Sequence, residues 1–205
     1  MRIVTSDDVA GAVGLADLVE PVARALAAYS RGQVRTAPMM LFDLPDGEVH
    51  VKAAVLDGAP SWSVKVSASV PGNAGRALPA AHSTVTLFDA TTGRPEVLIQ
   101  DDGGLLSGLR TAAAGAVAAR LLALPTETLL VIGTGLQARL QPQAFALQRP
   151  FSRLLVWGRR KVAAARTAED LRVALPEVHA LTVLERLDAT GPARSAPAST
   201  TGRPS

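Results

Sequence analysis

The sequence predicts an α/β protein, with an N-terminal α+β region followed by the beginning of a parallel sheet. Three observations lead to this prediction. Short segments of alternating polar and apolar residues, separated by turn residues, fill much of the N-terminal half, as in an antiparallel meander. A strongly apolar segment, 127–132, then runs into a glycine-rich turn and a helix. Strand-like and helical segments alternate after it, which is typical of parallel βαβ units.

Two helices are expected at the start of the chain. Ser6 can cap a short helix over 7–13, because Asp7 and Asp8 are favourable in its first turn. Apolar residues at helical spacing predict a longer helix over 16–30.

An antiparallel meander and a further helix are expected next. The strands cover 34–44, 48–56, 61–70, 83–89 and 96–100, and an alanine-rich helix covers about 105–123. Asp46-Gly47 is a hairpin signal between the first two strands. In the second and third strands, apolar residues share one face, and polar residues, including Lys52 and Lys65, share the other.

The turn after the apolar strand has the pattern Gly-x-Gly-x-x-Ala. Gly133 permits a tight turn, Gly135 lets the backbone approach a pyrophosphate, and Ala138 is small enough for close packing of helix on strand. The N-terminus of the following helix, over about 136–148, favours an anion. These features predict the start of a dinucleotide-binding (Rossmann) unit, although a purely structural glycine turn is the alternative.

The rest of the second region completes a βαβαβ pattern, which is half of such a sheet. Its further elements are a strand over 153–157, a helix over about 161–174 and a strand over 180–185. The acidic residue that binds the ribose of NAD is missing after the second strand, where Arg159 and Arg160 stand instead. Arginines suit the 2′-phosphate of NADP, so NADP is preferred over NAD, and an exposed basic loop is the alternative.

Composition excludes several classes of protein. The 205 residues include no cysteine, so disulfides and Cys-ligated zinc are excluded. The formal charge of +3 comes from scattered Lys and Arg, without a nucleic-acid-binding block. The acidic N-terminus is unlike a signal peptide, and no run of about 18 apolar residues predicts a membrane span. We therefore expect a cytoplasmic protein that binds neither nucleic acid nor membrane. No metal site is expected, because His50, His82 and His179 show no metal-ligand spacing.

Four cations are candidate ligand-binding residues, although none is decisive alone. Lys52 and Lys65 lie on the polar face of the meander, where lysines are more often simply solvated. Arg110 is surrounded by small residues that would let a ligand approach the backbone. Arg35, at the start of a strand, carries little information by itself.

Together these residues resemble the ornithine cyclodeaminase/mu-crystallin family. The order and spacing of the motifs agree from about residue 1 to 187. The matching stretches include Val64-Lys65-Val66, Pro71-Gly72-Asn73, Leu78-Pro79, Leu109-Arg110-Thr111-Ala112-Ala113-Ala114 and Gly133-Thr134-Gly135-Leu136-Gln137-Ala138-Arg139. The Leu-Arg-Thr helix followed by the Gly-x-Gly-x-Gln-Ala turn is a specific combination.

The resemblance implies NAD(P)-dependent hydride transfer at the α-carbon of an amino or imino acid, as in ornithine cyclodeaminases and pyrroline-2-carboxylate or ketimine reductases. It divides the chain into a substrate-binding and dimerisation domain over 1–122 and a partial Rossmann domain over 123–188, and it implies a homodimer. Arg35, Lys65 and Arg110 would hold the substrate carboxylate, with Lys52 as a further polar group in that pocket. The cofactor would be contacted by Thr111, Gly133, Gly135, Leu136, Gln137 and Arg159.

The sequence departs from the family pattern in two places. Ala77-Leu78-Pro79-Ala80 lacks the hydroxyl that usually follows this proline. After residue 188 the chain becomes a segment of Ala, Pro, Ser, Thr, Gly and Arg, which predicts a disordered tail over 189–205 and a match that ends before the catalytic Asp of the cyclodeaminases. The catalytic residue is therefore not assigned. The alternative to an active enzyme is a truncated, inactive remnant that at most binds nucleotide or dimerises, with the tail as a frameshift product.

Overall fold

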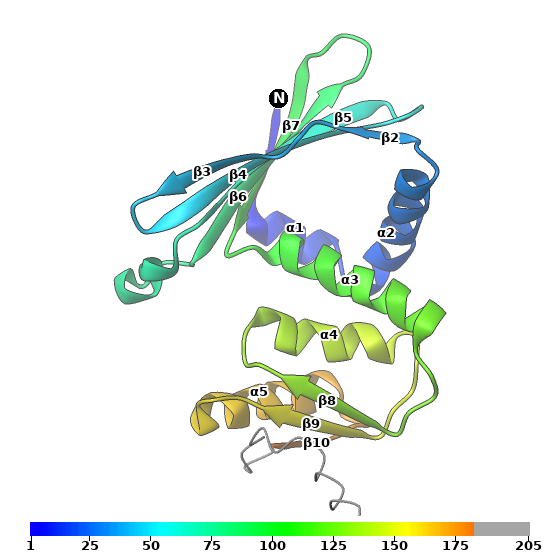
Figure 1. Cartoon of the computed structure of the whole chain (residues 1–205), viewed down its shortest axis with the longest axis vertical. Coiled ribbons are helices and arrows are strands. Elements are labelled where there is room, and N and C mark those ends of the chain that lie inside the picture. The colour runs from blue at the N-terminus through cyan, green and yellow to red at the C-terminus, as the bar shows by residue number, and fades with distance from the viewer. Residues whose placement is uncertain (183–205) are drawn as a thin grey trace, which may run out of the picture.

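The computed structural model describes residues 1–182, which form a large mixed sheet, a layer of helices and a small parallel sheet (Figure 1). The first region contains β1 (Arg2–Val4), α1 (Ser6–Ala12), α2 (Leu15–Ser30), β2 (Val34–Thr36), β3 (Met40–Leu44), β4 (Gly47–Leu56), β5 (Ser61–Ser69), the 3₁₀ helix η1 (Pro71–Arg76), β6 (Ala81–Asp89), β7 (Pro95–Asp102) and α3 (Leu105–Leu122). The second region contains β8 (Thr128–Ile132), α4 (Leu136–Ala146), β9 (Arg153–Trp157), α5 (Lys161–Ala174) and β10 (His179–Thr182). The predicted α/β fold is confirmed.

The seven-stranded sheet has the order β1-β7-β6-β5-β4-β2, and β3 also pairs with β4. The prediction of one strand over 34–44 was wrong, because β2 and β3 are separate strands that pair with opposite ends of β4. Pro38 lies in the break, and proline has no N–H group to donate to a strand ladder. β1 was not predicted; it is a three-residue strand that adds a parallel edge to β7.

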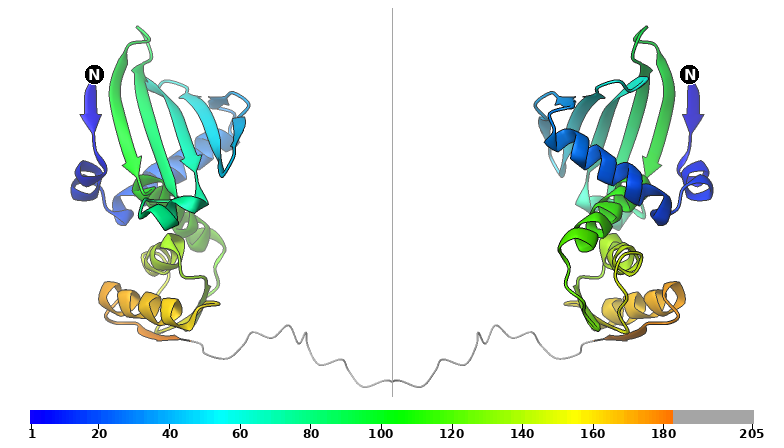
Figure 2. Two further views of the ribbon diagram at one scale, coloured as in Figure 1. Left: turned by 90° about the vertical axis from the view of Figure 1, so that its left-hand side faces the viewer. Right: turned by 90° about the vertical axis from the view of Figure 1, so that its right-hand side faces the viewer.

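Helices cover one face of this sheet, as Figures 1 and 2 show. Lys52 lies opposite Lys65 and Val51 lies opposite Val66, so the predicted division into a polar and an apolar face is confirmed. The polar face looks toward α2 and α3. Small residues let the helices approach closely, and the shared core of α2, α3 and α4 consists of Val19, Ala112, Ala113, Ala116, Val117 and Ala144.

The N-terminal cap of α1 differs from the prediction. Thr5, not Ser6, caps this helix, since its hydroxyl accepts a hydrogen bond from Asp8 N at 3.2 Å and Asp8 accepts one from Thr5 N at 2.9 Å. These hydrogen bonds lower the pKa of Asp8. The Ser6 hydroxyl instead donates to Gln100 O of β7 at 3.2 Å, which ties α1 to the sheet.

The second region has the predicted βαβαβ arrangement. Its strands are parallel in the order β10-β9-β8, which is the order of the first half of a Rossmann sheet. α5 packs on β9 and β10 around a core that includes Leu154, Val156 and Leu171. Pro142 lies inside α4 without ending it, and it is buried. The predicted tail over 189–205 and the end of the strand over 180–185 lie outside the described residues.

Within residues 1–182, one helix is long and apolar enough to cross a membrane by length and composition, namely α3. In this fold it packs against α2 on one side and α4 on the other, as the central helix between the two sheets (Figure 1). Its apolar character is therefore accounted for by its place in the core.

Candidate functional site

A hydrogen-bond network joins β5, β6, β7 and the first turn of α3. Asp101 is only 2% exposed, and its carboxylate accepts hydrogen bonds from Leu106 N at 2.8 Å and Ser107 N at 3.1 Å. Its Oδ2 also accepts from the hydroxyls of Ser107, at 2.7 Å, and Ser83, at 3.1 Å. Lys65 Nζ in turn donates to Ser107 Oγ. The sequence had indicated Lys65, but not the buried acid and hydroxyl that hold it.

Lys52, Lys65 and Arg110 form a cationic cluster. Lys52 lies directly opposite Lys65 on the same face of the sheet, and Arg110 follows Ser107 by three residues on α3. The pKa of Lys65 is lowered, mainly by burial and further by the positive charges of Arg110 and Lys52, while the charge of Asp101 opposes this change. Within residues 1–182, neither Lys52 nor Arg110 forms a side-chain hydrogen bond or ion pair, so both are free to bind an anion.

Arg35 does not join this cluster. Arg35 lies on β2, directly opposite Val55 of β4. The side chain of Val55 is on the face of the sheet opposite to that of Lys52. The Arg35 side chain is 73% exposed, and it forms an ion pair with Asp57 at 3.2 Å. The structure therefore brings together three of the four cations that were indicated by the sequence.

The glycine loop (residues 133–135) joins β8 to α4. Gly133 has a φ of 135°, a backbone conformation that residues other than glycine rarely adopt. Its N–H donates to Trp157 O at 2.8 Å. Gly135 is the N-cap of α4, and a Cβ there would meet no atom within 4 Å. No side chain caps this helix. Ala138 N donates to Gly135 O at 3.1 Å, whereas the N–H groups of Leu136 and Gln137 donate to no group of residues 1–182. An anion could bind there.

Arg139 holds the glycine loop in place. Its guanidinium donates to Thr134 O at 2.7 Å and Gly135 O at 3.3 Å, and Nε donates to Asp170 of α5 at 2.7 Å. This arginine appeared in the sequence only as part of a motif. Its i+4 position after Gly135 on a helix is the signal that could have indicated its role.

Where α3 and α4 meet, glycines of α3 face larger side chains of α4. A Cβ at Gly108 would lie 2.7 Å from Leu136 Cδ2, and one at Gly115 would lie 2.1 Å from Gln141 Oε1. Gln137 Nε2 donates to Gly108 O at 3.1 Å. Leu136 and Gln137, which were assigned to the cofactor by resemblance, are thus also the residues that fix α4 on α3.

Thr111 has a similar internal contact. Its hydroxyl donates to Ser107 O at 2.7 Å, one turn earlier on α3. The segment 107–111 therefore serves both halves of the site: Ser107 contacts Lys65, Gly108 contacts α4, and Arg110 belongs to the cationic cluster.

A basic pocket of about 330 Å³ lies beside the glycine loop. It is lined by Thr134 and Arg139 and, from the start of α5, by Arg160, Val162, Ala163 and Arg166. Arg160 is the N-cap of α5, and no side chain caps that helix. Arg159 is exposed and directly precedes Arg160 in the sequence, but it does not line this pocket.

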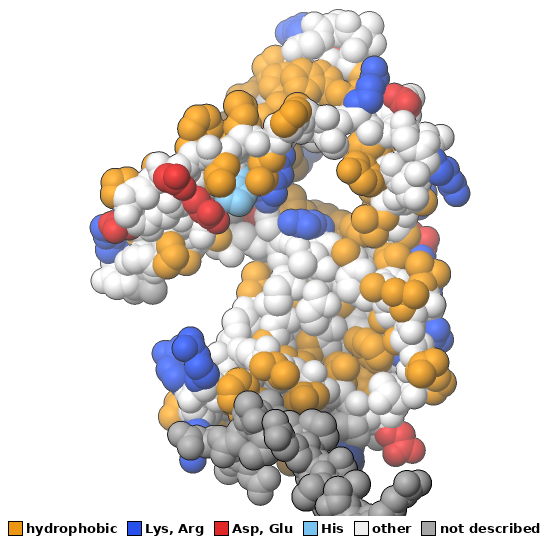
Figure 3. All heavy atoms as spheres, in the orientation of Figure 1, with side chains coloured by type: hydrophobic (Ala, Val, Ile, Leu, Met, Phe, Trp, Pro, Cys, Tyr) orange, Lys and Arg blue, Asp and Glu red, His pale blue; other side chains and the backbone are white. Residues whose placement is uncertain are grey.

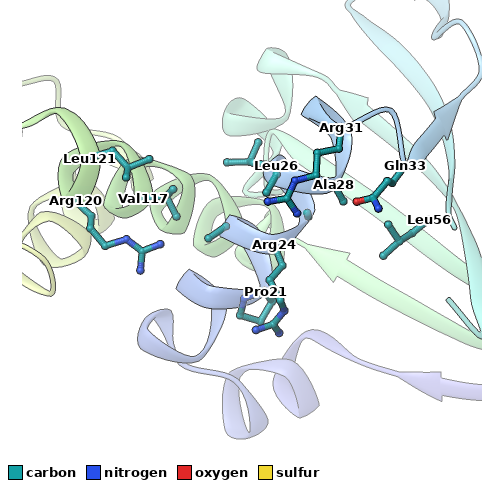
Figure 4. A pocket seen from close by; sticks show the side chains of 13 residues that line it. Pro21, Arg24, Leu26, Ala28, Arg31, Gln33, Leu56, Val117, Arg120 and Leu121 are labelled. Carbon is teal, nitrogen blue, oxygen red and sulfur yellow. The ribbon is translucent and has the colours of Figure 1, made fainter. Parts of the chain in front are cut away.

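Two small hollows adjoin the cationic cluster. One, of about 180 Å³, is lined by residues including Glu48, His50, Lys65 and Ser107. The other, of about 510 Å³, is mostly apolar and extends from Arg110 between α2 and the sheet. Figure 3 shows basic side chains in the recess between the sheet and the helices below it. A larger hollow of about 920 Å³ between α2 and α3 contains none of the predicted site residues (Figure 4).

The histidines do not form a metal site. Among residues 1–182, no group of three or more His, Cys, Asp and Glu side chains is arranged to hold a metal ion. His82 Nδ1 lies 3.0 Å from Asp102 Oδ1, and His50 lies beside Glu48.

Comparison with known proteins identifies the family of this chain. Residues 1–188 match the model of the ornithine cyclodeaminase/mu-crystallin family. The chain is 31% identical over 172 residues to a Δ1-pyrroline-2-carboxylate reductase of Burkholderia multivorans, covering 83% of this chain and 54% of that protein. The iminosuccinate reductase of Paracoccus denitrificans in complex with NAD⁺ has a TM-score of 0.77 at 28% identity, over 89% of this chain and 56% of that one.

A third comparison concerns the fold alone. The Thermococcus litoralis Δ1-pyrroline-2-carboxylate reductase, in complex with NADH and L-proline, has a TM-score of 0.80 at 24% identity, over 89% of this chain and 57% of that one. The chain thus spans about half the length of the relatives that it matches. From the family match over residues 1–188 and the arrangement of its sheet, helices and glycine loop, the chain belongs to the ornithine cyclodeaminase/mu-crystallin family.

Proposed function

We propose that this chain carries the substrate-binding and nucleotide-binding parts of an NAD(P)-dependent enzyme that acts at the α-carbon of an amino or imino acid. The observation that carries the proposal is the position of the cationic cluster beside the glycine loop. Ser107 and Arg110 lie on the same α3 segment whose Gly108 contacts the first turn of α4. A ligand on the cations and a nucleotide on the loop would therefore be neighbours.

The cationic cluster would hold the substrate carboxylate. Arg110 offers paired N–H donors that match the two oxygens of a carboxylate, and Lys65 and Lys52 add positive charge. Lys65 is held by Ser107, so little further ordering is needed when a carboxylate binds. An orienting contact at the carboxylate would fix the α-carbon relative to the cofactor. Arg35, exposed and paired with Asp57, is left out of this proposal.

The residues present fit a dinucleotide. Gly133 adopts a backbone conformation open mainly to glycine, Gly135 leaves space for a pyrophosphate, and the N–H groups of Leu136 and Gln137 could donate to its oxygens. When bound, the nicotinamide accepts or donates a hydride. Arg139 would keep the loop in position, while Leu136 and Gln137 would hold α4 against the substrate-binding helix.

We further propose that NADP is preferred over NAD. The basic pocket beside the glycine loop contains Arg160 and Arg166 at the uncapped start of α5, and exposed Arg159 adjoins it in the sequence. A 2′-phosphate would find both guanidinium groups and helix N–H groups there. The proposal also places the substrate-binding part at 1–122 and the nucleotide-binding part at 123–188, in the cytoplasm.

A homodimer is proposed through the outer face of the large sheet. Met40, Phe42 and Val66 share this face, and they are 53%, 54% and 41% exposed. Apolar side chains clustered in this way are typical of a surface that binds another protein.

Titration of NADPH by fluorescence, followed by turnover assays with ornithine, alanine and Δ1-pyrroline-2-carboxylate, tests the proposal. Nucleotide binding with turnover of one of these compounds is the expected result. Absence of binding at millimolar NADPH contradicts it. Binding without turnover would favour the inactive remnant.

A further inference from the structure

We propose that Asp101 and Ser107 act together as positioning residues for Lys65. The buried carboxylate of Asp101 orients the Ser107 hydroxyl, and this hydroxyl accepts a hydrogen bond from the Lys65 ammonium and holds it within the cationic cluster. The inference rests on the proposed role of Lys65 in binding a carboxylate. No contact between Asp101 and the ligand is required.

The direction of each hydrogen bond supports this role. A serine hydroxyl has one proton, and Ser107 donates it to Asp101 Oδ2 at 2.7 Å. The Ser107 oxygen is therefore left as an acceptor, and Lys65 Nζ donates to it. An ammonium group can only donate, so the hydrogen bond between Lys65 and Ser107 cannot run in the opposite direction while Lys65 is charged.

Asp101 is itself fixed by contacts that do not involve Lys65. Leu106 N and Ser107 N donate to it from the start of α3, and the Ser83 hydroxyl donates to it from β6. A carboxylate with this many donors stays in one orientation, and it is buried. It therefore supplies a fixed negative charge behind a flexible lysine that stands between other cations.

The electrostatic surroundings explain why such a device is useful. Burial and the charges of Arg110 and Lys52 lower the pKa of Lys65, whereas Asp101 raises it. Without the serine and the aspartate, the ammonium would lose its proton at lower pH and would also move among its rotamers. The charged or titratable groups around Lys65 come from four elements: Lys52, Glu48 and His50 of β4, His82 of β6, Asp101 of β7 and Arg110 of α3.

Lysine NMR on the full chain tests the inference. The sequence contains only three lysines, Lys52, Lys65 and Lys161, so each labelled lysine gives a resolvable signal, and a Lys65→Met variant identifies that of Lys65. Ser107→Ala should move the Lys65 titration to lower pH, because the charged form loses its acceptor. Ser107→Thr, which keeps a hydroxyl, should restore it. Exposed Lys161 serves as the internal reference.

Ser83→Ala is the matched control. It removes a hydroxyl hydrogen bond to the same Asp101 oxygen without touching Lys65, so the Lys65 titration should not change. Asp101→Asn should move it further than Ser107→Ala, and the conclusion stands on the serine variants if Asp101→Asn does not fold. An unchanged Lys65 titration in Ser107→Ala, or an equal change in Ser83→Ala, overturns the inference.

Binding of L-proline separates this inference from the proposed function. Ser107→Ala should weaken the binding by about tenfold at neutral pH, which is the effect of one hydrogen bond to a charged group. If the unaltered chain binds no L-proline, the proposed carboxylate site fails, whereas the titration still decides whether the serine and aspartate position Lys65. If L-proline binds and Ser107→Ala leaves its affinity unchanged, the positioning role is wrong.

Discussion

The cationic cluster and the glycine loop are built in opposite ways. The cluster joins side chains from β4, β5 and α3, and a buried aspartate of β7 supports it. The loop is a contiguous stretch of backbone, 133–135, with an arginine from the next helix turn as its support. Side chains supply the charge in the first case and backbone N–H groups supply it in the second. Ligand binding at the cluster should therefore depend on pH and on residues far away in the sequence. Ligand binding at the loop should depend on whether a side chain is added at its glycines.

The two sites depend on one short segment of α3. Residues 107–111 contact Lys65 through Ser107 and α4 through Gly108, and they carry Arg110. A Cβ at Gly108 would lie 2.7 Å from Leu136 Cδ2, so the Leu136 side chain at the start of α4 would have to move. We expect each site to be separable by mutation of its own side chains, whereas a substitution at Gly108, where α3 contacts the first turn of α4, should affect both.

The largest effect is expected from Arg110→Ala. Removing the guanidinium should weaken L-proline binding by about 100-fold, because it leaves the carboxylate without its paired donors. NADPH affinity should stay within about twofold, since Arg110 belongs to the cluster and not to the loop. Calorimetric titration measures both. Arg94→Ala, in the exposed turn between β6 and β7, is the control. Equal L-proline affinity in Arg110→Ala would remove this residue from the site.

Gly135→Ala tests the loop in the complementary direction. The φ of Gly135 is −87° and its Cβ would meet no protein atom, so the variant should fold with an unchanged melting temperature. A methyl group in the space assigned to the pyrophosphate should weaken NADPH binding by about 30-fold. Gly11→Ala is the matched control, because a Cβ there also meets nothing within 4 Å. Full NADPH affinity in Gly135→Ala would show that the nucleotide does not approach this loop.

Arg160→Ala tests the origin of the proposed NADP preference. Loss of one guanidinium from the basic pocket should weaken NADPH binding by about tenfold and leave NADH binding unchanged. Arg159→Ala, just outside the pocket lining, should have a smaller effect. Fluorescence titrations with both nucleotides give the ratio. Equal losses for NADPH and NADH would contradict recognition of a 2′-phosphate.

The smallest expected effect is a pH dependence of carboxylate binding. The pKa of Lys65 lies below the ordinary value of 10.5, because the group is partly buried among cations. The protonated form binds the carboxylate, so affinity should be present at neutral pH and should fall as pH rises through this lowered pKa. Nucleotide binding, which depends on backbone N–H groups, should not follow the same curve. A carboxylate affinity that stays constant up to the ordinary lysine range would contradict the role of Lys65.

The sequence predicted the loop well because its signal is local. Gly133, Gly135 and the strand before them are adjacent in the chain, and the backbone conformation of the turn accounts for both glycines. The fold class and most strands were predicted from alternation and turn residues for the same reason. β1 was missed because three residues give too short a pattern to recognise.

The support of the cationic cluster could not be predicted in this way. Lys65 and Ser107 are 42 residues apart, and Asp101 resembles any other acid near a strand end. Only the register of β5, β6 and β7 brings these groups together. Arg35 illustrates the reverse case: resemblance placed it with the other cations, whereas its strand register places it on the opposite face.

The central claim is that the cationic cluster and the glycine loop bind two ligands side by side across α3. A transferred NOE experiment on the full chain, with NADPH and L-proline present together, tests it most directly. Contacts between the nicotinamide protons and the proline α-proton are expected, and they should disappear in Arg110→Ala while NADPH remains bound. Simultaneous binding of both ligands without any NOE between them would contradict the claim.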